Sequence, residues 1–272
     1  MSASSIGYIM IAVVFLFNST SCTKEVDKKL DPSQILEEMK LFEQKYQQKN
    51  IDLKIRTNDN GQEPNCFEAT SNCNPAVSIV NYELDIPAYA PCKAIVNCTM
   101  QSCYATNGSG QYIFTINFFN FSAVPKPGPD CQNLINWWKQ LAMSGNYGQL
   151  KSEREAFKNA AKDLIEKIKI QEYLQLFPQT FQCSQNNYVL TSKFYSGSCY
   201  KTCLSLNPFD MIDWYCSDAC CKRTTGWCVE ANGTIYQGPP NYFNIGTCDN
   251  PAAASCPAGY FEISSCSLNC QP

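Results

Sequence analysis

The sequence predicts an α+β fold that is rich in disulfides, with a long amphipathic helix, a small antiparallel sheet and a loop-rich, cysteine-dense C-terminal module. Three observations predict this class. Two charged segments have the periodicity of helices, and the weakly charged region between them alternates in the way that a half-buried strand does. The 272 residues include 18 cysteines, which is typical of an oxidising compartment. A chain of this length buries a core without disulfides, so the cysteines indicate a cellular location as well as a structural need.

The N-terminus has the pattern of a secretory signal peptide. Residues 6–17 are almost wholly apolar, and small polar residues follow them. This apolar stretch is too short to span a bilayer. We expect residues 1–21 to be removed and the mature chain to be secreted or extracellular, with no stable membrane span. Whether Cys22 is retained decides whether the number of thiols is even or odd.

Charge and cysteine content divide the mature chain into three segments. We expect a charged helical segment at 22–65, an α+β core domain at 66–182 and a cysteine-rich module at 183–272. Four sequons are candidate glycosylation sites in a secreted glycoprotein, at Asn97, Asn107, Asn120 and Asn232.

The first helix is predicted to begin at Asp31-Pro32, a capping residue followed by a proline suited to the first helical turn. Its apolar stripe comprises Ile35, Met39, Phe42 and Tyr46. A strand follows, because Val80, Tyr82, Leu84 and Ile86 alternate with Ile79, Asn81, Glu83 and Asp85.

A hairpin is predicted from the segments 93–104 and 112–121, which flank the turn dipeptide Asn107-Gly108. The second segment is rich in aromatic residues. We interpret it as a core strand packed under the long helix and not as a ligand platform.

A short helix is predicted around 134–141, and the long helix from the capping box Ser152-x-x-Glu155 to the vicinity of Pro178. Opposite charges one turn apart predict the intrahelical pairs Lys162–Glu166 and Asp163–Lys167. A further strand is expected at 187–195.

The C-terminal segment contains two Cys-x3-Cys pairs, Cys199/Cys203 and Cys216/Cys220. Residues four apart lie on one face of a helix, so two antiparallel helices would form the disulfides Cys199–Cys220 and Cys203–Cys216. The intervening Asn207-Pro208 would cap the second helix. The spacing resembles the helical hairpins of small mitochondrial import chaperones and of plant hairpinin peptides.

An overlapping pattern combines the vicinal Cys220-Cys221 with Gly226-Trp227-Cys228 and with Cys266-x3-Cys270. It resembles fragments of a hevein-type chitin-binding domain. That resemblance implies a sugar platform at Trp227 and the disulfides Cys203–Cys221, Cys216–Cys228 and Cys266–Cys270. Four thiolates of this region could alternatively bind zinc, namely Cys216, Cys220, Cys221 and Cys228, but in an exported chain we expect disulfides and no metal site.

The absence of histidine excludes the Ser–His and Cys–His nucleophile pairs. A net charge of −3 disfavours a nucleic-acid partner. The remaining route to hydrolysis is a carboxylate pair, for which Asp210 and Asp213 lie among aromatic residues. Asp210 is better explained as a residue at a helix N-terminus, and Asp213 as a solvated acid.

We therefore expect an extracellular recognition or structural component, with an unknown protein or glycan ligand, no cofactor and no catalytic residue. The alternative is a carbohydrate-binding protein or a carboxylate-dependent glycoside hydrolase, with Trp227, Asp210 and Asp213 at its ligand site.

Overall fold

The structure is a computed structural model, and it describes residues 31–47, 66–67, 72–185, 187–248, 255–268 and 270. These residues belong to the compact unit Asp31–Pro272. The predicted signal peptide 1–21 and Cys22 lie outside the described residues. The α+β class is confirmed, because helices accompany a seven-stranded and a four-stranded sheet.

The three predicted helices are present in the described part of the chain. They are α1 (Pro32–Gln47), α2 (Gln132–Met143) and α3 (Tyr147–Leu176), with two short 3-10 helices, η1 (Pro87–Tyr89) and η2 (Pro129–Cys131). The Asp31 carboxylate accepts a hydrogen bond from the Ser33 backbone N–H at 2.8 Å, which confirms the predicted cap of α1.

The long helix begins earlier than predicted, because its N-cap is Asn146 and not Ser152. Gly145 adopts a left-handed conformation with φ of 72° directly after α2, and this lets the chain reverse and enter α3 at Tyr147. The Ser152-x-x-Glu155 pattern therefore lies inside the helix. Leu150, which is fully buried, extends the apolar stripe beyond the predicted start and explains the additional turn.

The large sheet has the strand order β1-β2-β3-β4-β7-β8, and β9 also pairs with β7. Its strands are β1 (Val77–Asp85), β2 (Lys93–Thr106), β3 (Tyr112–Pro125), β4 (Tyr188–Gly197), β7 (Cys220–Val229), β8 (Ile235–Gln237) and β9 (Asn241–Ile245). The β3–β4 pair is parallel and the other pairs are antiparallel. The predicted hairpin is confirmed as β2–β3, and the predicted strand at 187–195 is confirmed as β4.

The alternation predicted for the first strand is interrupted by an irregularity between Ile79 and Tyr82. Asn81 has a positive φ of 50° there, a conformation that asparagine tolerates better than most residues. The irregularity shifts the register, so Ile79 is buried together with Leu84, although strict alternation places them on opposite faces.

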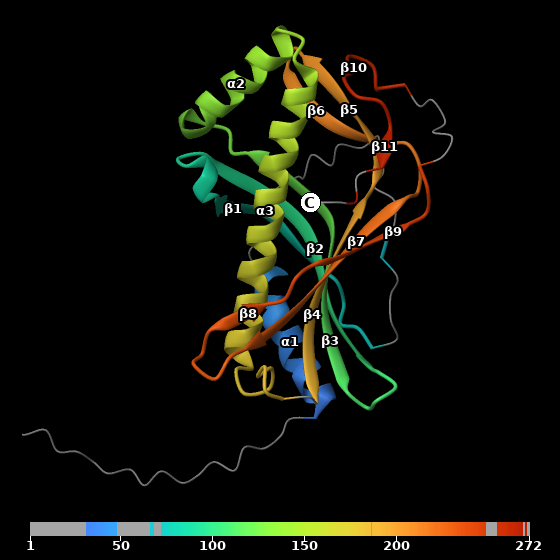
Figure 1. The fold of residues 1–272 in the computed structure, drawn as a ribbon. Coiled ribbons are helices and arrows are strands. Elements are labelled where there is room, and N and C mark those ends of the chain that lie inside the picture. The colour runs from blue at the N-terminus through green and yellow to red at the C-terminus, as the bar shows by residue number, and fades with distance from the viewer. Residues whose placement is uncertain are drawn as a thin grey trace, which may run out of the picture. The chain divides into compact units, whose positions relative to one another are not determined.

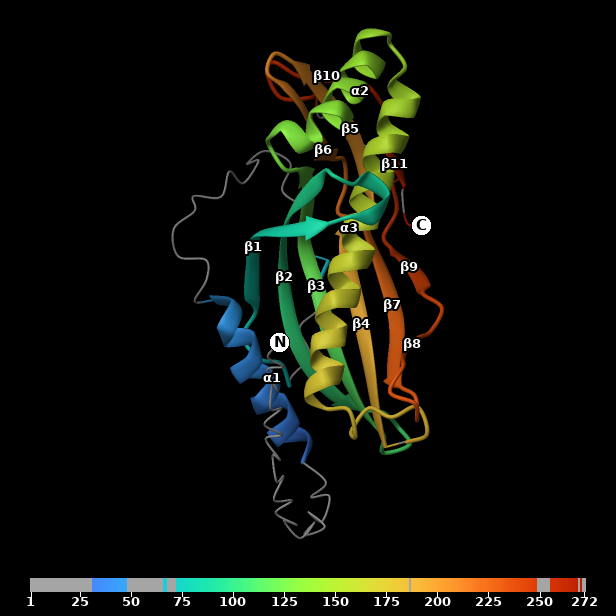
Figure 2. The same ribbon diagram turned by 90° about the vertical axis from the view of Figure 1, so that its left-hand side faces the viewer.

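The long helix lies along one face of the large sheet, with α1 beside it (Figures 1 and 2). Phe114, Ile116 and Phe118 of β3 are fully buried, so the aromatic strand belongs to the core, as predicted. Phe157 and Ile165 of α3 are also fully buried. Two elements that are each apolar on one side thus bury those sides against each other.

The small sheet is formed by β5 (Cys199–Leu206), β6 (Phe209–Tyr215), β10 (Phe261–Glu262) and β11 (Ser267–Leu268). The chain passes from β4 into β5 at Ser198, and from β6 into β7 through residues 216–219. The β4–β7 pair and the β5–β6 pair therefore belong to one long hairpin that changes sheets along its length (Figure 1).

The predicted helical hairpin is corrected to this β-hairpin. A spacing of four places two side chains on one face of a strand as well as of a helix, so Cys-x3-Cys does not distinguish the two. The neighbouring β-branched and aromatic residues favour strands; they include Tyr200, Thr202, Phe209, Ile212 and Trp214. The predicted helix cap Asn207-Pro208 lies in the turn between β5 and β6.

Eight disulfides connect the described cysteines. They are Cys66–Cys220, Cys73–Cys103, Cys92–Cys131, Cys183–Cys228, Cys199–Cys248, Cys203–Cys256, Cys216–Cys266 and Cys221–Cys270. The Cys199–Cys220 and Cys203–Cys216 pairs are not formed, and neither are the pairs implied by the hevein resemblance. In β5 and β6, Cys203 lies opposite Ile212, and both Cys199 and Cys203 bond outward to the chain beyond β9.

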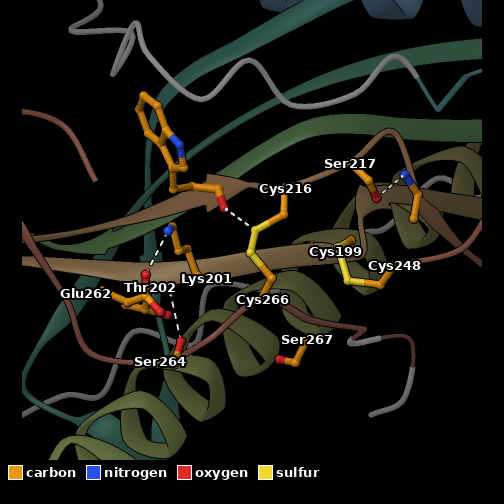
Figure 3. Close-up of a disulfide and its surroundings, with 12 residues drawn as sticks. Cys199, Lys201, Thr202, Cys216, Ser217, Cys248, Glu262, Ser264, Cys266 and Ser267 are labelled. Carbon is orange, nitrogen blue, oxygen red and sulfur yellow. Dashed lines mark hydrogen bonds and ion pairs between the residues drawn. A yellow bond between two sulfur atoms is a disulfide. The ribbon is translucent and has the colours of Figure 1, made fainter. Parts of the chain in front are cut away.

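Those outward bonds attach the C-terminal segment to the hairpin. Figure 3 shows Cys216–Cys266 beside Cys199–Cys248. Close to them, Lys201 pairs with Glu262 at 2.7 Å, and the Thr202 N–H donates to the Ser264 hydroxyl at 3.0 Å. Most of the described residues of 183–272 belong to strands β4 to β11, so this part of the chain is not loop-rich, which corrects the prediction.

The boundary predicted between 182 and 183 falls inside the large sheet. Strand β3 pairs with β4 from Tyr112↔Tyr188 to Phe118↔Phe194, and Cys66 is bonded to Cys220. The amino-acid composition changes at residue 183, where cysteines become frequent and charged residues rare, but strand pairing continues across this position. The two segments share one sheet and one core.

Candidate functional site

A cleft of about 380 Å³ lies between α3 and strands of both sheets. It lies where the long hairpin leaves the large sheet for the small one, so that α3 is flanked by both. Its lining comes from α3, β3, β4, β5, β6, β9, β11 and the Cys221–Cys270 disulfide. Segments from residue 121 to residue 270 meet here, which makes the cleft the candidate site.

One face of α3 supplies the polar side of the cleft. Glu155, Lys158, Asn159 and Lys162 line it, and spacings of three, four and seven residues place side chains on one helix face. Asn159 is exposed at the cleft surface, whereas Lys162 is half-buried.

The strands supply a mixed aromatic and polar wall. Three strands each contribute two residues spaced by two, and such residues share a strand face: Phe194 and Ser196 on β4, Asp213 and Tyr215 on β6, and Tyr242 and Asn244 on β9. Phe121 packs edge-on against Phe194, with ring centroids 5.3 Å apart. In the whole lining, aromatic side chains are combined with a larger number of polar and charged ones.

Asp213 is held as an anion by two cations from α3, because Arg154 and Lys158 both donate hydrogen bonds to its carboxylate. Burial by itself would raise the pKa of Asp213, but the two cations lower it well below its ordinary range. Asp213 is consequently an ionised structural partner and cannot act as a general acid.

The second carboxylate of the cleft is also occupied. Glu155 accepts a hydrogen bond from the Tyr200 hydroxyl at 3.1 Å, and Lys151 lies 3.7 Å from the same oxygen. Both acidic side chains in the lining are therefore engaged by groups of the protein.

Lys162 differs from the other cations of this region. Its Nζ lies 5.0 Å from the centroid of the Phe194 ring, a cation–π contact. Burial and the nearby Arg223 lower the pKa of Lys162 to about 8. The carboxylates predicted to form pairs along α3, Asp163 and Glu166, both bind Arg223 instead.

The structure separates the predicted ligand residues. Asp213 lines the cleft, but Asp210 lies three positions away on the same strand, and odd spacings point to opposite faces. Asp210 accepts a hydrogen bond from the Tyr260 hydroxyl at 2.6 Å. The predicted carboxylate pair is thus corrected, since each acid has its own partners.

Trp227 is a core residue and not a sugar platform. Its side chain is buried, and its indole N–H donates to the Ser192 hydroxyl at 2.7 Å. Trp227 lies on β7 opposite Leu190 of β4, so its position in the sheet interior explains its burial.

The four candidate glycosylation sites differ in exposure. Asn120 and Asn232 are exposed, whereas Asn97 and Asn107 are half-buried. The Asn107 amide oxygen accepts backbone hydrogen bonds from Ser109 and Gln111. The Asn232 side chain also accepts a backbone hydrogen bond, from Thr234 at 2.8 Å, so the two sites differ in exposure and not in having a role in a turn.

The cysteines proposed as zinc ligands are all in disulfides. In the part of the chain that the structure describes, no group of three or more acidic or cysteine side chains is placed to hold a metal ion. Among the described cysteines, Cys98 alone is free, and burial raises the pKa of its thiol to about 12.

Two further results concern membrane-spanning helices and similarity to known proteins. No helix among the described residues is both long and apolar enough to cross a membrane. Comparison of the chain with protein-family models, with curated proteins and with solved structures gave no match.

Sequence reasoning missed the cleft because its residues are distributed over eight segments. One local signal was present. Arg154, Lys158 and Lys162 repeat every four residues, and like charges at this spacing repel each other along a helix. Such a row of cations beside an apolar stripe indicates that anions from other elements lie next to the cations. Asp213 of β6 confirms this for Arg154 and Lys158.

Proposed function

We propose that this protein is an extracellular recognition protein that binds a small organic ligand in the cleft between α3 and the two sheets. The observation that carries the proposal is the cleft itself. Its volume of about 380 Å³ lies within the range of small-molecule sites, and its lining combines aromatic side chains with a larger number of polar and charged ones. The eight disulfides support an extracellular location.

The geometry favours binding over hydrolysis. A glycosidase needs one carboxyl that carries a proton and a second that faces it across the scissile bond. Asp213 is ionised between Arg154 and Lys158, and Asp210 is bound by Tyr260. Neither residue has the environment of a general acid.

A second candidate, carbohydrate binding, has support from the tyrosines. Tyr200, Tyr215 and Tyr242 line the cleft, and each combines a ring face with a polar hydroxyl. This candidate relocates the sugar site predicted at Trp227 to the cleft.

A fragment screen followed by a cleft-blocking substitution tests the proposal. The screen would contain neutral aromatic compounds, aromatic acids and monosaccharides, detected by saturation-transfer NMR on the oxidised protein. Asn159→Trp would fill the cleft from an exposed helix position, and Ala156→Trp places the same side chain at an exposed position of α3 outside the lining.

We expect compounds that bind the natural protein and the Ala156→Trp variant but not the Asn159→Trp variant. A screen without binders would refute the proposal. Binders that Asn159→Trp leaves unaffected would also refute it, because they would occupy another surface.

A further inference from the structure

The charged groups around the cleft do not sum to zero. Arg154 and Lys158 share Asp213, Lys151 faces Glu155, and Arg223 is bound by Asp163 and Glu166. These groups comprise five cations, counting Lys162, and four carboxylates. The surplus is one positive charge.

Lys162 is the one of these cations that has no ion pair. No carboxylate among the described residues lies within ion-pair distance of its Nζ, although Asp163 and Glu166 act on it electrostatically from farther away. Its Nζ faces the Phe194 ring instead. The neighbouring Arg223, whose guanidinium carbon lies 5.6 Å from the centroid of the same ring, adds positive potential. A half-buried cation without a carboxylate carries a desolvation cost that a bound anion would offset.

The surroundings of Lys162 suit an organic anion better than an inorganic one. Half-buried aromatic side chains line the cleft beside it, namely Phe121, Tyr200, Tyr215 and Tyr242. The volume is about 380 Å³, whereas one water molecule occupies about 30 Å³ of liquid. A sulfate or phosphate ion is only a few times larger than a water molecule, so it would leave most of the cleft unfilled. A ring or short carbon body would fill the remaining space and pack on the aromatic walls.

We propose that the ligand of the cleft is a small organic anion, whose single carboxylate or sulfate group binds Lys162 while its ring or carbon body packs on Phe121 and Tyr242. This inference rests on the proposed function of the cleft and specifies its ligand. An aromatic acid and an acidic sugar both have this chemistry, and the test below distinguishes them.

Other ligand classes fit the charges less well. A cationic ligand would need a carboxylate that is still available, but Asp213 and Glu155 are already engaged. A neutral ligand would leave the charge of Lys162 uncompensated in the filled, drier cleft.

Calorimetric titration with matched pairs tests the proposal. One pair is naphthalene-2-carboxylate and its neutral carboxamide, and the other is methyl β-D-glucuronoside and methyl β-D-glucoside. Within each pair the two compounds differ mainly in charge. Sodium sulfate serves as the inorganic probe.

We expect the anion of one pair to bind at least about tenfold more tightly than its neutral partner, as one hydrogen bond to a charged group implies. The pair that shows the difference identifies the source of the anion. Lys162→Met should abolish the difference, and Lys167→Met, at an exposed position of the same helix, should preserve it. Because burial lowers the pKa of Lys162, the Lys162→Met variant should melt at the same temperature as the natural protein or higher.

Three outcomes overturn the proposal. Equal affinities of the neutral and the anionic partner would show that the cleft binds ligands without selecting anions, and the proposed function would survive. Binding of sulfate alone would show an adventitious ion only. Absence of any binding at about 1 mM would refute both this inference and the proposed function.

Discussion

Asp213 shows how neighbouring side chains decide what an acidic residue can do. In the sequence it is indistinguishable from Asp210 as a catalytic candidate, because both lie among aromatic residues. In the structure Asp213 joins two cations of α3 to β6, while Asp210 accepts hydrogen bonds from the Tyr260 hydroxyl and from the Met211 N–H. The first residue connects β6 to α3 through two ion pairs, and the second connects β6 to the segment before β10 through one hydroxyl.

A pair of isosteric substitutions distinguishes these roles. Asp213→Asn leaves two cations, Arg154 among them, without their anion, and we expect a loss of about 3 kcal/mol in the free energy of unfolding. Asp210→Asn replaces a charged acceptor of two hydrogen bonds by an amide with one acceptor oxygen, so one of the two bonds is lost, and we expect a loss of about 1 kcal/mol. Urea unfolding monitored by tryptophan fluorescence measures both, and equal losses would contradict the assignment.

Glu43 is a buried acid whose ionisation makes the free energy of unfolding depend on pH. It is fully buried on α1, and the Tyr173 hydroxyl of α3 donates to it at 2.6 Å. Burial raises its pKa to about 7, against the opposing effect of that hydrogen bond. Because the folded pKa exceeds the unfolded value of 4.5, the stabilising contribution of the neutral acid is fully present below pH 4.5 and is lost as the pH rises through about 7.

The Glu43→Gln substitution tests this linkage. The amide keeps a hydrogen-bond acceptor for Tyr173 and carries no charge into the core. We expect the variant to gain up to about 3 kcal/mol over the natural protein at pH 8 and little at pH 4.5, since one pKa unit corresponds to about 1.4 kcal/mol. Unfolding free energies across this pH range measure the gain, and a difference independent of pH would contradict the argument.

At the scale of elements, the turn of the β2–β3 hairpin is stabilised by hydrogen bonds of the Asn107 side chain. The Asn107 side chain accepts hydrogen bonds from the backbone N–H groups of Ser109 and Gln111 at 3.1 and 2.9 Å, and its amide donates to the Gln111 side chain at 3.0 Å. These bonds close the turn between the two longest strands of the sheet, as asparagine commonly does in turns.

Removal of that side chain should therefore weaken the hairpin. We expect Asn107→Ala to lower the free energy of unfolding by about 1 to 2 kcal/mol, because two backbone donors lose their acceptor. Ser109→Ala is the control, since it keeps both backbone donors to Asn107 and removes only the exposed hydrogen bond from the Ser109 hydroxyl, and its effect should stay within about 0.5 kcal/mol. Thermal unfolding of both variants measures the difference, and similar losses would show that the turn is held by other contacts.

At the scale of the whole molecule, the disulfides differ in the length of chain that they close. Cys66–Cys220 spans 154 residues and connects the segment before β1 to the large sheet, where Phe67 stacks on Phe119 with centroids 4.9 Å apart. Cys73–Cys103 spans 30 residues. Longer loops lose more entropy in the unfolded chain when they are closed.

Replacement of both cysteines of each bridge by alanine tests this difference. We expect the Cys66→Ala/Cys220→Ala variant to lose about 1 kcal/mol more stability than the Cys73→Ala/Cys103→Ala variant, from the logarithmic dependence on loop length. Guanidinium unfolding under non-reducing conditions compares them. A larger loss in the Cys73–Cys103 variant would show that native contacts around each bridge outweigh chain entropy.

The local elements were predictable because their causes are local. The proline at the start of α1, the Asn-Gly turn of the hairpin and the apolar stripe of α3 act within a few residues, so periodicity and capping reveal them. The cysteine content likewise indicates an oxidising compartment whichever pairs form. The sequence by itself determined the α+β class, the helices and the β2–β3 hairpin.

Only the tertiary structure decided the disulfide partners, the joining of the two halves and the cleft. A Cys-x3-Cys spacing suits a helix and a strand equally, and the partners at Cys248, Cys256 and Cys266 lie about 50 residues from their bonded cysteines. The parallel pairing of β3 with β4 bridges α2 and α3 and has no local signal. Lys162 has no ion pair among the described residues because Asp213 of β6 reaches α3 at Arg154 and Lys158, while Asp163 and Glu166 bind Arg223 of β7. Both arrangements are set by packing between distant segments.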